Sequence, residues 1–294
     1  MKKLFLYGIS SFLLTTLFVR CNDEPKETPK EEAAAVATKN VTEDWKLGVQ
    51  LWTFRMFSFV EAINKVDSAG IKFIEAYPGQ KLGTEFKKEA FGSDMSAEAR
   101  TKIKELLQSK GITLMAFGVI GGGTPDEWKK NFAFAKDMGI QYLTVEPTKM
   151  LWGLVDSLAG ATGIKVAIHD HPKPSAYWHP DSVLAAMKGH PNIYACADIG
   201  HWARSGLDIV DCLKKLEGRI LGAHLKDVNK FDSTKAEDVI PGTGVIKFPE
   251  VFAEFKRLGF TGMFSIEREN NWDHNLPDVI QIKSFFEQEK AKLK

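Results

Sequence analysis

Short apolar runs recur along the chain from about residue 44 to its end, and a turn and an amphipathic stretch separate each run from the next. Apolar runs without a clean alternation of polar and apolar residues are typical of strands that are covered on both faces. The pattern therefore predicts the strands of a buried parallel sheet. The eight runs are 47–54, 71–76, 112–119, 142–145, 165–168, 193–197, 220–224 and 262–266.

The stretches between these runs carry apolar residues at a spacing of three to four, which predicts amphipathic helices. Capping residues such as Ser96, Thr124 and Asp181 stand at the start of several stretches, and glycines such as Gly111 and Gly139 follow several others. These signals indicate where the helices begin and end. The helical stretches are 58–68, 97–109, 126–138, 181–188, 208–216, 249–258 and 277–290.

Strands that alternate with helices form parallel βαβ units, because a parallel neighbour is reached only through a crossover connection. Eight such units in the roughly 250 residues from 44 to 294 favour a closed barrel over an open doubly wound sheet. No glycine-rich dinucleotide-binding fingerprint follows the first run, which removes the main support for a Rossmann-type sheet. We therefore predict an α/β protein with a single-domain (β/α)8 TIM barrel over residues 44–294.

Residues 1–21 have the form of a secretory signal peptide. Lys2 and Lys3 precede an apolar run over residues 4–19 that is too short for a comfortable membrane span. Cys21 follows this run and is a candidate lipid-acceptor cysteine of a bacterial lipoprotein, although Arg20 stands where such signals usually have a small residue. A cleaved signal or a retained anchor is the alternative. We expect an exported protein, either periplasmic or lipid-anchored to the bacterial cell envelope.

The amino-acid composition limits the class of protein and the partners that it can bind. Residues 22–43 are rich in Glu, Lys, Pro and Ala and predict a disordered tether, because they bury too little apolar surface to offset the entropy of ordering. The 294-residue chain is 44% hydrophobic and 26% charged, which suffices for a large core, and its net charge of +1 gives no basic field for nucleic acid. Beyond Cys21, only Cys196 and Cys212 remain, and we predict that both are buried free thiols. The oligomeric state stays open.

Polar or ionisable residues stand at or just past the carboxyl end of nearly every predicted strand. In a barrel these ends form one mouth, which is where barrel enzymes place their active sites. We therefore expect the chemistry at this mouth. The residues are Gln50, Trp52, Arg55, Glu75, Glu146, His169, Asp170, His171, Asp198, His201, His224, Lys226, Asp227, Glu267 and Arg268.

Four of these residues are metal-ligand types that follow four consecutive strands, so their side chains are expected to meet at one point. They are His169, Asp198, His224 and Glu267. A mixed set of nitrogen and oxygen donors suits Mn, Zn, Co or Fe(II), and the two carboxylates leave room for Mg. We predict one divalent metal ion in this set, with Mn favoured.

Five motifs at these positions resemble the sugar phosphate isomerase/epimerase family of xylose isomerase-like barrels. They are residues 48–52 (GVQLW), 197–202 (ADIGHW), 224–227 (HLKD), 241–244 (PGTG) and 264–267 (FSIE). The resemblance covers essentially everything after the tether. It implies that Asp198, His224 and Glu267 bind the metal and that His201 contacts substrate near it.

The fifth strand departs from the family pattern. Many relatives carry a metal-binding glutamate there that also acts as an acid or base, whereas this chain has His169. The symmetrical two-glutamate mechanism of the 3-epimerases is therefore in doubt for this chain. Glu146, one strand earlier, is a candidate for the second base.

The resemblance implies proton abstraction next to a sugar carbonyl, through a metal-stabilised enediolate. Glu267 or Glu146 is the expected base. Lys226 is expected either to donate to an oxyanion or leaving group, or to pair with Asp227 or Glu267. The expected substrate-binding residues are His201, His171, Glu75, Gln50, Trp52 and Trp178.

Three functions remain open at this level. The leading hypothesis is a metal-dependent isomerase or epimerase on a non-phosphorylated sugar, because sugar phosphates are cytosolic and the protein is expected to be exported. The second is a lyase or hydratase that acts on a 3-keto-sugar or 3-keto-glycoside by elimination, which needs one base. The third is a sugar-binding lipoprotein without catalysis.

Overall fold

The barrel begins with a short 3-10 helix. The computed structural model describes residues 40–293. The helix η1 (Val41–Asp44) is capped by Asn40, whose side chain accepts a hydrogen bond from the Thr42 N–H at 3.2 Å. The boundary that the sequence suggested, between residues 43 and 44, therefore falls inside this helix. The predicted signal peptide, Cys21 and the tether up to residue 39 lie outside the described residues.

Eight parallel strands close into one barrel in the order β1-β10-β7-β6-β5-β4-β3-β2. Each predicted apolar run overlaps one strand, and Val49 on the first strand pairs with Ile266 on one side and Ile74 on the other, which closes the ring. The prediction of a single-domain (β/α)8 barrel is confirmed. The strands are β1 (Lys46–Gln50), β2 (Phe73–Ala76), β3 (Thr113–Gly121), β4 (Tyr142–Glu146), β5 (Lys165–His169), β6 (Ile193–Asp198), β7 (Ile220–Leu225) and β10 (Met263–Ile266).

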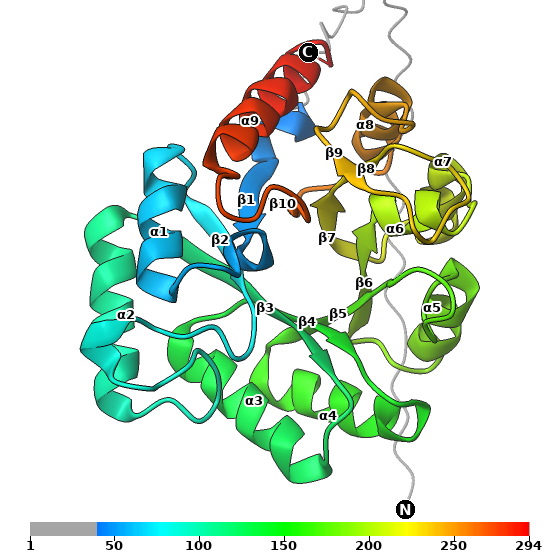
Figure 1. Cartoon of the computed structure of the whole chain (residues 1–294). Helices are drawn as coiled ribbons and strands as arrows, with labels where there is room; N and C mark the ends of the chain where they lie inside the picture. Colours follow the sequence, from blue (N-terminus) through cyan, green and yellow to red (C-terminus); the bar gives the residue numbers. More distant parts are fainter. Residues whose placement is uncertain (1–39, 294) are drawn as a thin grey trace, which may run out of the picture. The chain divides into compact units, whose positions relative to one another are not determined.

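Helices surround this ring of strands (Figure 1). Two of them start with a capping box, in which a hydroxyl side chain and a glutamate satisfy the free backbone N–H groups: Ser58 with Glu61, and Thr124 with Glu127. The helices are α1 (Phe59–Ser68), α2 (Ala97–Lys110), α3 (Pro125–Met138), α4 (Trp152–Thr162), α5 (Pro180–Met187), α6 (Ile199–Arg204), α7 (Ile209–Lys215), α8 (Phe248–Arg257) and α9 (Leu276–Ala291).

Apolar side chains fill both the barrel and the layer between strands and helices. The cluster inside the barrel consists of Met115, Ala116, Tyr142, Ala167, Cys196 and Met263. A larger cluster packs the strands against the helices and includes Trp45, whose indole N–H donates to the Phe260 carbonyl at 2.7 Å. The barrel is thus a packed core and not a channel. Cys196 and Cys212 are buried and free, as predicted.

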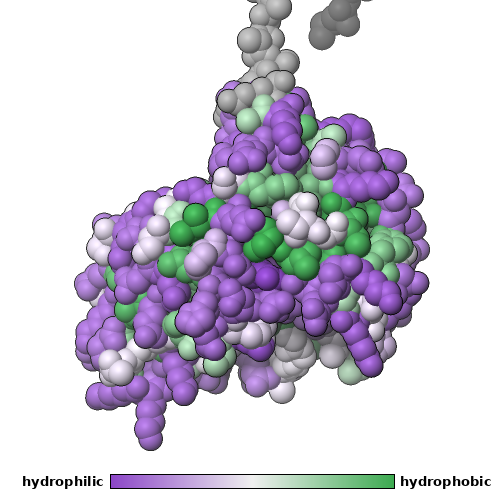
Figure 2. Space-filling model, turned by 45° about the horizontal axis from the view of Figure 1, so that its top comes forward, coloured by the Kyte–Doolittle hydropathy of each residue, from purple (hydrophilic) through white to green (hydrophobic). Residues whose placement is uncertain are grey.

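The face shown in Figure 2 is mainly hydrophilic, although apolar side chains gather near its centre. The large apolar side chains that remain exposed are Met56, Met150, Phe231, Val245 and Ile280. Within residues 40–293, no helix has the length and apolar character that crossing a bilayer requires.

Candidate metal centre and active site

Buried ionisable side chains meet at the carboxyl ends of the strands. Glu146, His169 and Asp198 are the last residues of β4, β5 and β6. His224 lies near the end of β7, and Glu267 directly follows β10. Because all these strands run parallel, their ends lie on one side of the barrel. The structure therefore brings together the four metal ligands that the sequence indicated.

One carboxylate oxygen, Oδ2 of Asp198, lies at the centre of the cluster. The Nζ atom of Lys226 is 3.0 Å from it, and Nδ1 of His224 is 3.5 Å from it. The Nε2 atoms of His169 and His201 are each 3.6 Å from it. The other oxygen, Oδ1, accepts a hydrogen bond from the backbone N–H of His201 at 2.9 Å. This bond fixes the carboxylate so that Oδ2 faces the four nitrogens.

Glu75 orients His224. Its Oε2 atom lies 3.0 Å from His224 Nε2 and accepts a hydrogen bond from the Ser265 hydroxyl at 3.0 Å. The Nδ1 atom of His224 is then directed at Glu267 Oε2, 3.0 Å away. A carboxylate behind a histidine in this way sets the tautomer and ring orientation of a metal ligand. Glu75 is fully buried inside the barrel. Its contacts are with His224 and Ser265, and its role in substrate binding stays a prediction.

Glu146 orients two other histidines. Its Oε1 atom lies 3.4 Å from His169 Nδ1 and also forms a hydrogen bond with His171 Nδ1. Burial acts to raise the pKa of Glu146, but the bonds to both histidines outweigh it and lower the pKa to about 2. His169 is buried and faces Asp198, whereas the His171 side chain is 47% exposed. Glu146 thus links a histidine of the buried cluster to one at the surface.

Lys226 is a fully buried cation between carboxylates. Its Nζ atom lies 2.8 Å from Glu267 Oε2, in addition to the contact with Asp198, and 3.3 Å from Glu269 Oε2. Glu269 also accepts a hydrogen bond from the Arg204 guanidinium at 3.2 Å. Glu269 could not be recognised from the sequence, because it follows the strand by three residues and no motif marks it.

Burial and neighbouring charge act in opposite directions on these groups. Burial acts to raise the pKa of Asp198 and of Glu267, but the nearby cationic groups, including Lys226, hold both pKa values well below the usual range. Burial acts to lower the pKa of Lys226, but Asp198 and Glu267 hold it well above its usual value. Both carboxylates are therefore ionised at neutral pH, and Lys226 is an ammonium ion.

The donor set fits a divalent cation. Asp198 Oδ2 and His169 Nε2 are buried atoms that make no hydrogen bond among residues 40–293, although Asp198 Oδ2 has an ion-pair contact with Lys226 at 3.0 Å. Ligand atoms of His169, Asp198, His201 and Glu267 all lie within 4.8 Å of one another. This group contains His201 where the sequence predicted His224, although His224 Nδ1 also faces Asp198 and Glu267. Imidazole nitrogens with carboxylate oxygens suit Mn, Zn, Co or Fe(II). The buried cluster can therefore bind a metal ion.

A cleft of about 280 Å³ opens beside this cluster. Three of the predicted substrate-binding residues, Gln50, Trp52 and His171, line it, whereas Trp178 does not. His201 does not line it and is buried beside Asp198. The cleft is thus bordered by potential metal ligands, by polar side chains and by aromatic rings. The lining residues are Gln50, Trp52, Tyr77, Pro78, Gly118, Val119, His171, Glu267 and Glu269.

Asp227 is a structural residue of the loops around the mouth. Its carboxylate accepts hydrogen bonds from four backbone N–H groups at 2.9 to 3.2 Å, those of Val228, Gly242, Gly244 and Ile246. These bonds tie the loop at residues 241–244 to the small antiparallel sheet of β8 (Asp227–Val228) and β9 (Asp238–Val239). The HLKD and PGTG motifs therefore meet at one carboxylate.

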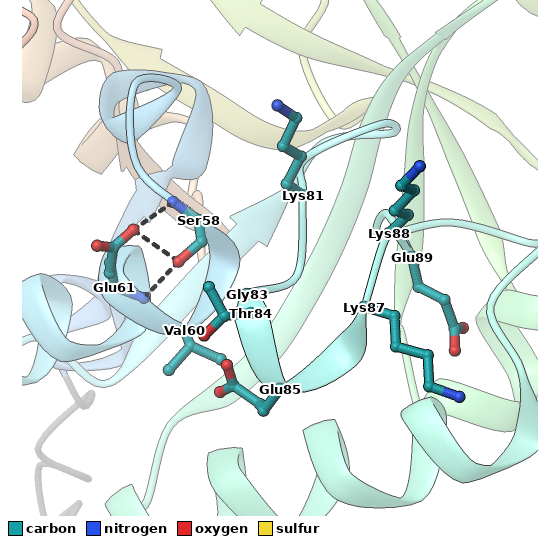
Figure 3. Close-up of a pocket in the computed structure, with 10 residues that line it drawn as sticks. All are labelled: Ser58, Val60, Glu61, Lys81, Gly83, Thr84, Glu85, Lys87, Lys88 and Glu89. Atoms are coloured by element: carbon teal, nitrogen blue, oxygen red, sulfur yellow. Dashed lines mark hydrogen bonds between the residues drawn. The ribbon is translucent and has the colours of Figure 1, made fainter.

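A second hollow, of about 570 Å³, lies beside the start of α1 and the loop that follows β2. Figure 3 shows Glu61 bonded to Ser58 in the capping box and the side chain of Lys87 pointing away from those of Lys81 and Lys88. The charged side chains that line this hollow do not converge on one point. The cleft at the barrel mouth is therefore the candidate active site.

Comparison with known proteins gives the family that the barrel resembles. A family model described as xylose isomerase-like TIM barrel matches residues 63–287. Inosose dehydratase 2 of Bacillus cereus is 34% identical over 152 residues, which are 46% of this chain and 51% of that protein. Inosose dehydratase 1 of the same organism is 26% identical over 213 residues, 58% of this chain and 72% of that protein. The match to the first of these relatives thus spans about half of its length.

A solved structure gives a longer match. A putative uncharacterized protein from Parabacteroides distasonis is 37% identical, with a TM-score of 0.69, and the match covers 83% of this chain and 99% of that one. Its sequence and fold are both similar to those of this chain. Since the two curated relatives above are dehydratases, the prediction of an enzyme is confirmed, whereas the reaction and the substrate are matters for proposal.

Proposed function

The chain belongs to the xylose isomerase-like TIM barrel family, and from this membership we propose that it is a divalent-metal-dependent enzyme that removes a proton next to the carbonyl group of a keto-sugar. Loss of a substituent from the neighbouring carbon then completes an elimination. The observation that carries this proposal is the end of β5, where His169 and His171 share Glu146. The mouth thus has one histidine that faces the metal cluster and one that lines the cleft.

The metal ligands, His171 and Glu146 have separate roles in the proposed reaction. The metal, with Mn favoured, would be held by Asp198, Glu267 and the surrounding histidines, and it supplies a positive charge for the oxygen that becomes negative when the proton leaves. His171 accepts the proton from carbon, since its ring lines the cleft and its Nδ1 atom is held by Glu146. Glu146 is therefore a positioning residue and not the direct base expected from the sequence.

The ammonium of Lys226 is the proton donor for the leaving group. It lies 3.3 Å from Glu269, a carboxylate that lines the cleft. The electron pair of the broken C–H bond forms the new double bond, and the leaving group departs with the proton from Lys226. Atoms and charge therefore balance with one base and one acid.

Two features favour elimination over isomerisation, which the sequence analysis placed first. The carboxylate that many relatives have at the end of the fifth strand is His169 here, so the symmetrical pair of glutamate bases is absent from the cluster. The named relatives are inosose dehydratases. Isomerisation differs from elimination only in the fate of the negative charge after proton removal, and product analysis distinguishes the two.

The cleft favours a non-phosphorylated substrate. No lysine or arginine is among the described residues that line it, so the cleft lacks the basic side chains that usually bind a phosphate group. Trp52 and Tyr77, with ring centroids 5.0 Å apart, offer an apolar wall that suits the C–H face of a sugar ring. An exported enzyme would meet free keto-sugars or keto-glycosides.

The test is a panel of keto-sugars and 3-keto-glycosides incubated with the Mn²⁺-loaded protein, with products analysed by mass and NMR. We expect the loss of water or of an aglycone. His171→Ala should lower the rate by about 10³-fold, and Glu146→Gln by about 10²-fold through kcat with little change in KM, because it acts through His171. A product of unchanged mass would show isomerisation instead, and full activity of His171→Ala would contradict the assigned base.

A further inference from the structure

We propose that Lys226 and the divalent ion compete for the same two carboxylate oxygens, and that metal binding moves the Lys226 ammonium onto Glu269 at the edge of the cleft. This inference rests on the proposed function only in taking the buried cluster as a metal site. It adds that occupancy of the metal site determines where the proton donor lies.

The contacts of Lys226 carry the first step. Its Nζ atom lies 3.0 Å from Asp198 Oδ2 and 2.8 Å from Glu267 Oε2. These are the oxygens that face the histidines, because Asp198 Oδ1 is already engaged by a backbone N–H. A metal among these histidines needs the same oxygens. Two positive ions within a few ångströms in a buried site repel each other strongly, so they do not share them.

Glu269 provides the second position for the ammonium. It lies 3.3 Å from Lys226 Nζ, and its side chain is 25% exposed at the cleft. Arg204, which also contacts Glu269, is paired with Asp238 at 2.5 Å. The three carboxylates of Asp198, Glu267 and Glu269 are then left to balance one divalent ion and one ammonium ion. Lys226 can therefore give up Asp198 and Glu267 without becoming an unpaired buried charge, which would cost several kcal/mol.

The backbone next to Lys226 leaves room for the side chain. A Cβ atom added at Gly200 would lie 2.6 Å from Lys226 Cγ and 2.8 Å from its Cδ. Glycine at this position therefore accommodates the aliphatic stem of the lysine. The flexible stem permits the ammonium to move while the backbone stays in place. After that movement Nζ lies at the cleft, where it can contact a leaving group.

The first experiment titrates Mn²⁺ alone into the wild-type protein, Lys226→Met and Lys226→Gln, by calorimetry. Both variants remove the competing charge, and we expect each to bind Mn²⁺ at least tenfold more tightly than the wild type. The glutamine variant keeps hydrogen-bond donors near Asp198 and Glu267, in case the methionine variant does not fold, and circular dichroism checks both. Equal or weaker Mn²⁺ affinity in a folded variant would overturn the inference.

The second experiment places Glu269→Gln in the wild-type and Lys226→Gln backgrounds. In the wild type it removes the second position of the ammonium, so Mn²⁺ affinity should fall at least tenfold. In the Lys226→Gln background the loss should be under threefold, because no ammonium needs that position. Glu237→Gln, at an exposed carboxylate, is the control. Equal losses in both backgrounds would show that Glu269 acts on the metal by its charge alone, which contradicts the proposed exchange.

These measurements are independent of turnover. A protein that shows the expected Mn²⁺ affinities but changes no keto-sugar keeps this inference and loses the proposed function. A protein that binds no Mn²⁺ either with or without Lys226 loses the inference, whatever its activity.

Discussion

Asp198 connects the buried cluster of candidate metal ligands to the backbone of α6, because its two oxygens have different partners. Oδ1 accepts the backbone N–H of His201 at the start of α6, and Oδ2 faces Lys226 and three histidines. A buried carboxylate that is fixed on one side and surrounded by cationic groups on the other stays ionised. It is therefore a ready ligand for a divalent ion.

His169 is the predicted metal ligand that distinguishes this chain from the family pattern, and its removal tests the cluster directly. We expect His169→Ala to lower Mn²⁺ affinity at least tenfold, because the variant loses a ligand whose Nε2 atom faces Asp198. Metal analysis of the purified protein, with calorimetry, measures the effect. His274→Ala, at an exposed loop histidine, is the control. A full metal content in His169→Ala would mean that the ion lies elsewhere.

The positions of the strand ends predicted which of these residues meet, but not what each one contacts. Asp198, His224 and Glu267 follow buried apolar runs, so their convergence could be deduced from the barrel alone. The role of Glu75 could not be deduced in this way. Its side chain points into the packed barrel and contacts His224, which lies far from it in the sequence. Glu269 lies in a loop after β10, and loop positions carry no periodicity.

At the scale of elements, the small sheet of β8 and β9 holds the loops beside the mouth. It depends on Asp227, which accepts four backbone N–H groups. In Asp227→Ala these donors lose their partner, and we expect the free energy of unfolding to fall by about 3 kcal/mol. Urea denaturation measures it. Lys235→Ala, exposed on the same hairpin, should change it by under about 0.5 kcal/mol. An equal effect of the two substitutions would contradict the structural role of Asp227.

Regular elements were predictable where burial alternates along them. The seven amphipathic stretches each correspond to a helix, whereas α4 and α6 were missed. Every residue of α6 is buried, so it shows no polar face, and α4 contains Gly153 and Gly160 and few charges. The first strand was predicted too long. Its last four residues form the 3-10 helix η2 (Leu51–Phe54), because the Gln50 side chain accepts the Trp52 N–H at 3.0 Å.

At the scale of the whole molecule, we propose that the barrel works outside the cytoplasm on a lipid anchor. The support lies in residues 1–21, where Cys21 follows an apolar run over residues 4–19. In a bacterial host, Cys21→Ala should abolish incorporation of a labelled lipid precursor and release the protein from the membrane fraction. Cys212→Ala, at a buried thiol, is the control. Unchanged labelling of Cys21→Ala would contradict lipidation at this cysteine.

The central claim is metal-dependent removal of a proton next to a carbonyl, and deuterium exchange measures that step without knowledge of the final product. The protein is incubated in D2O with a panel of keto-sugars, with Mn²⁺ or with a chelator, and NMR follows the hydrogen on the carbon beside the carbonyl. We expect exchange with Mn²⁺ on at least one substrate, and its loss with chelator and in Glu267→Gln. Exchange that persists in chelator, or no exchange on any substrate with Mn²⁺ bound, would contradict the claim.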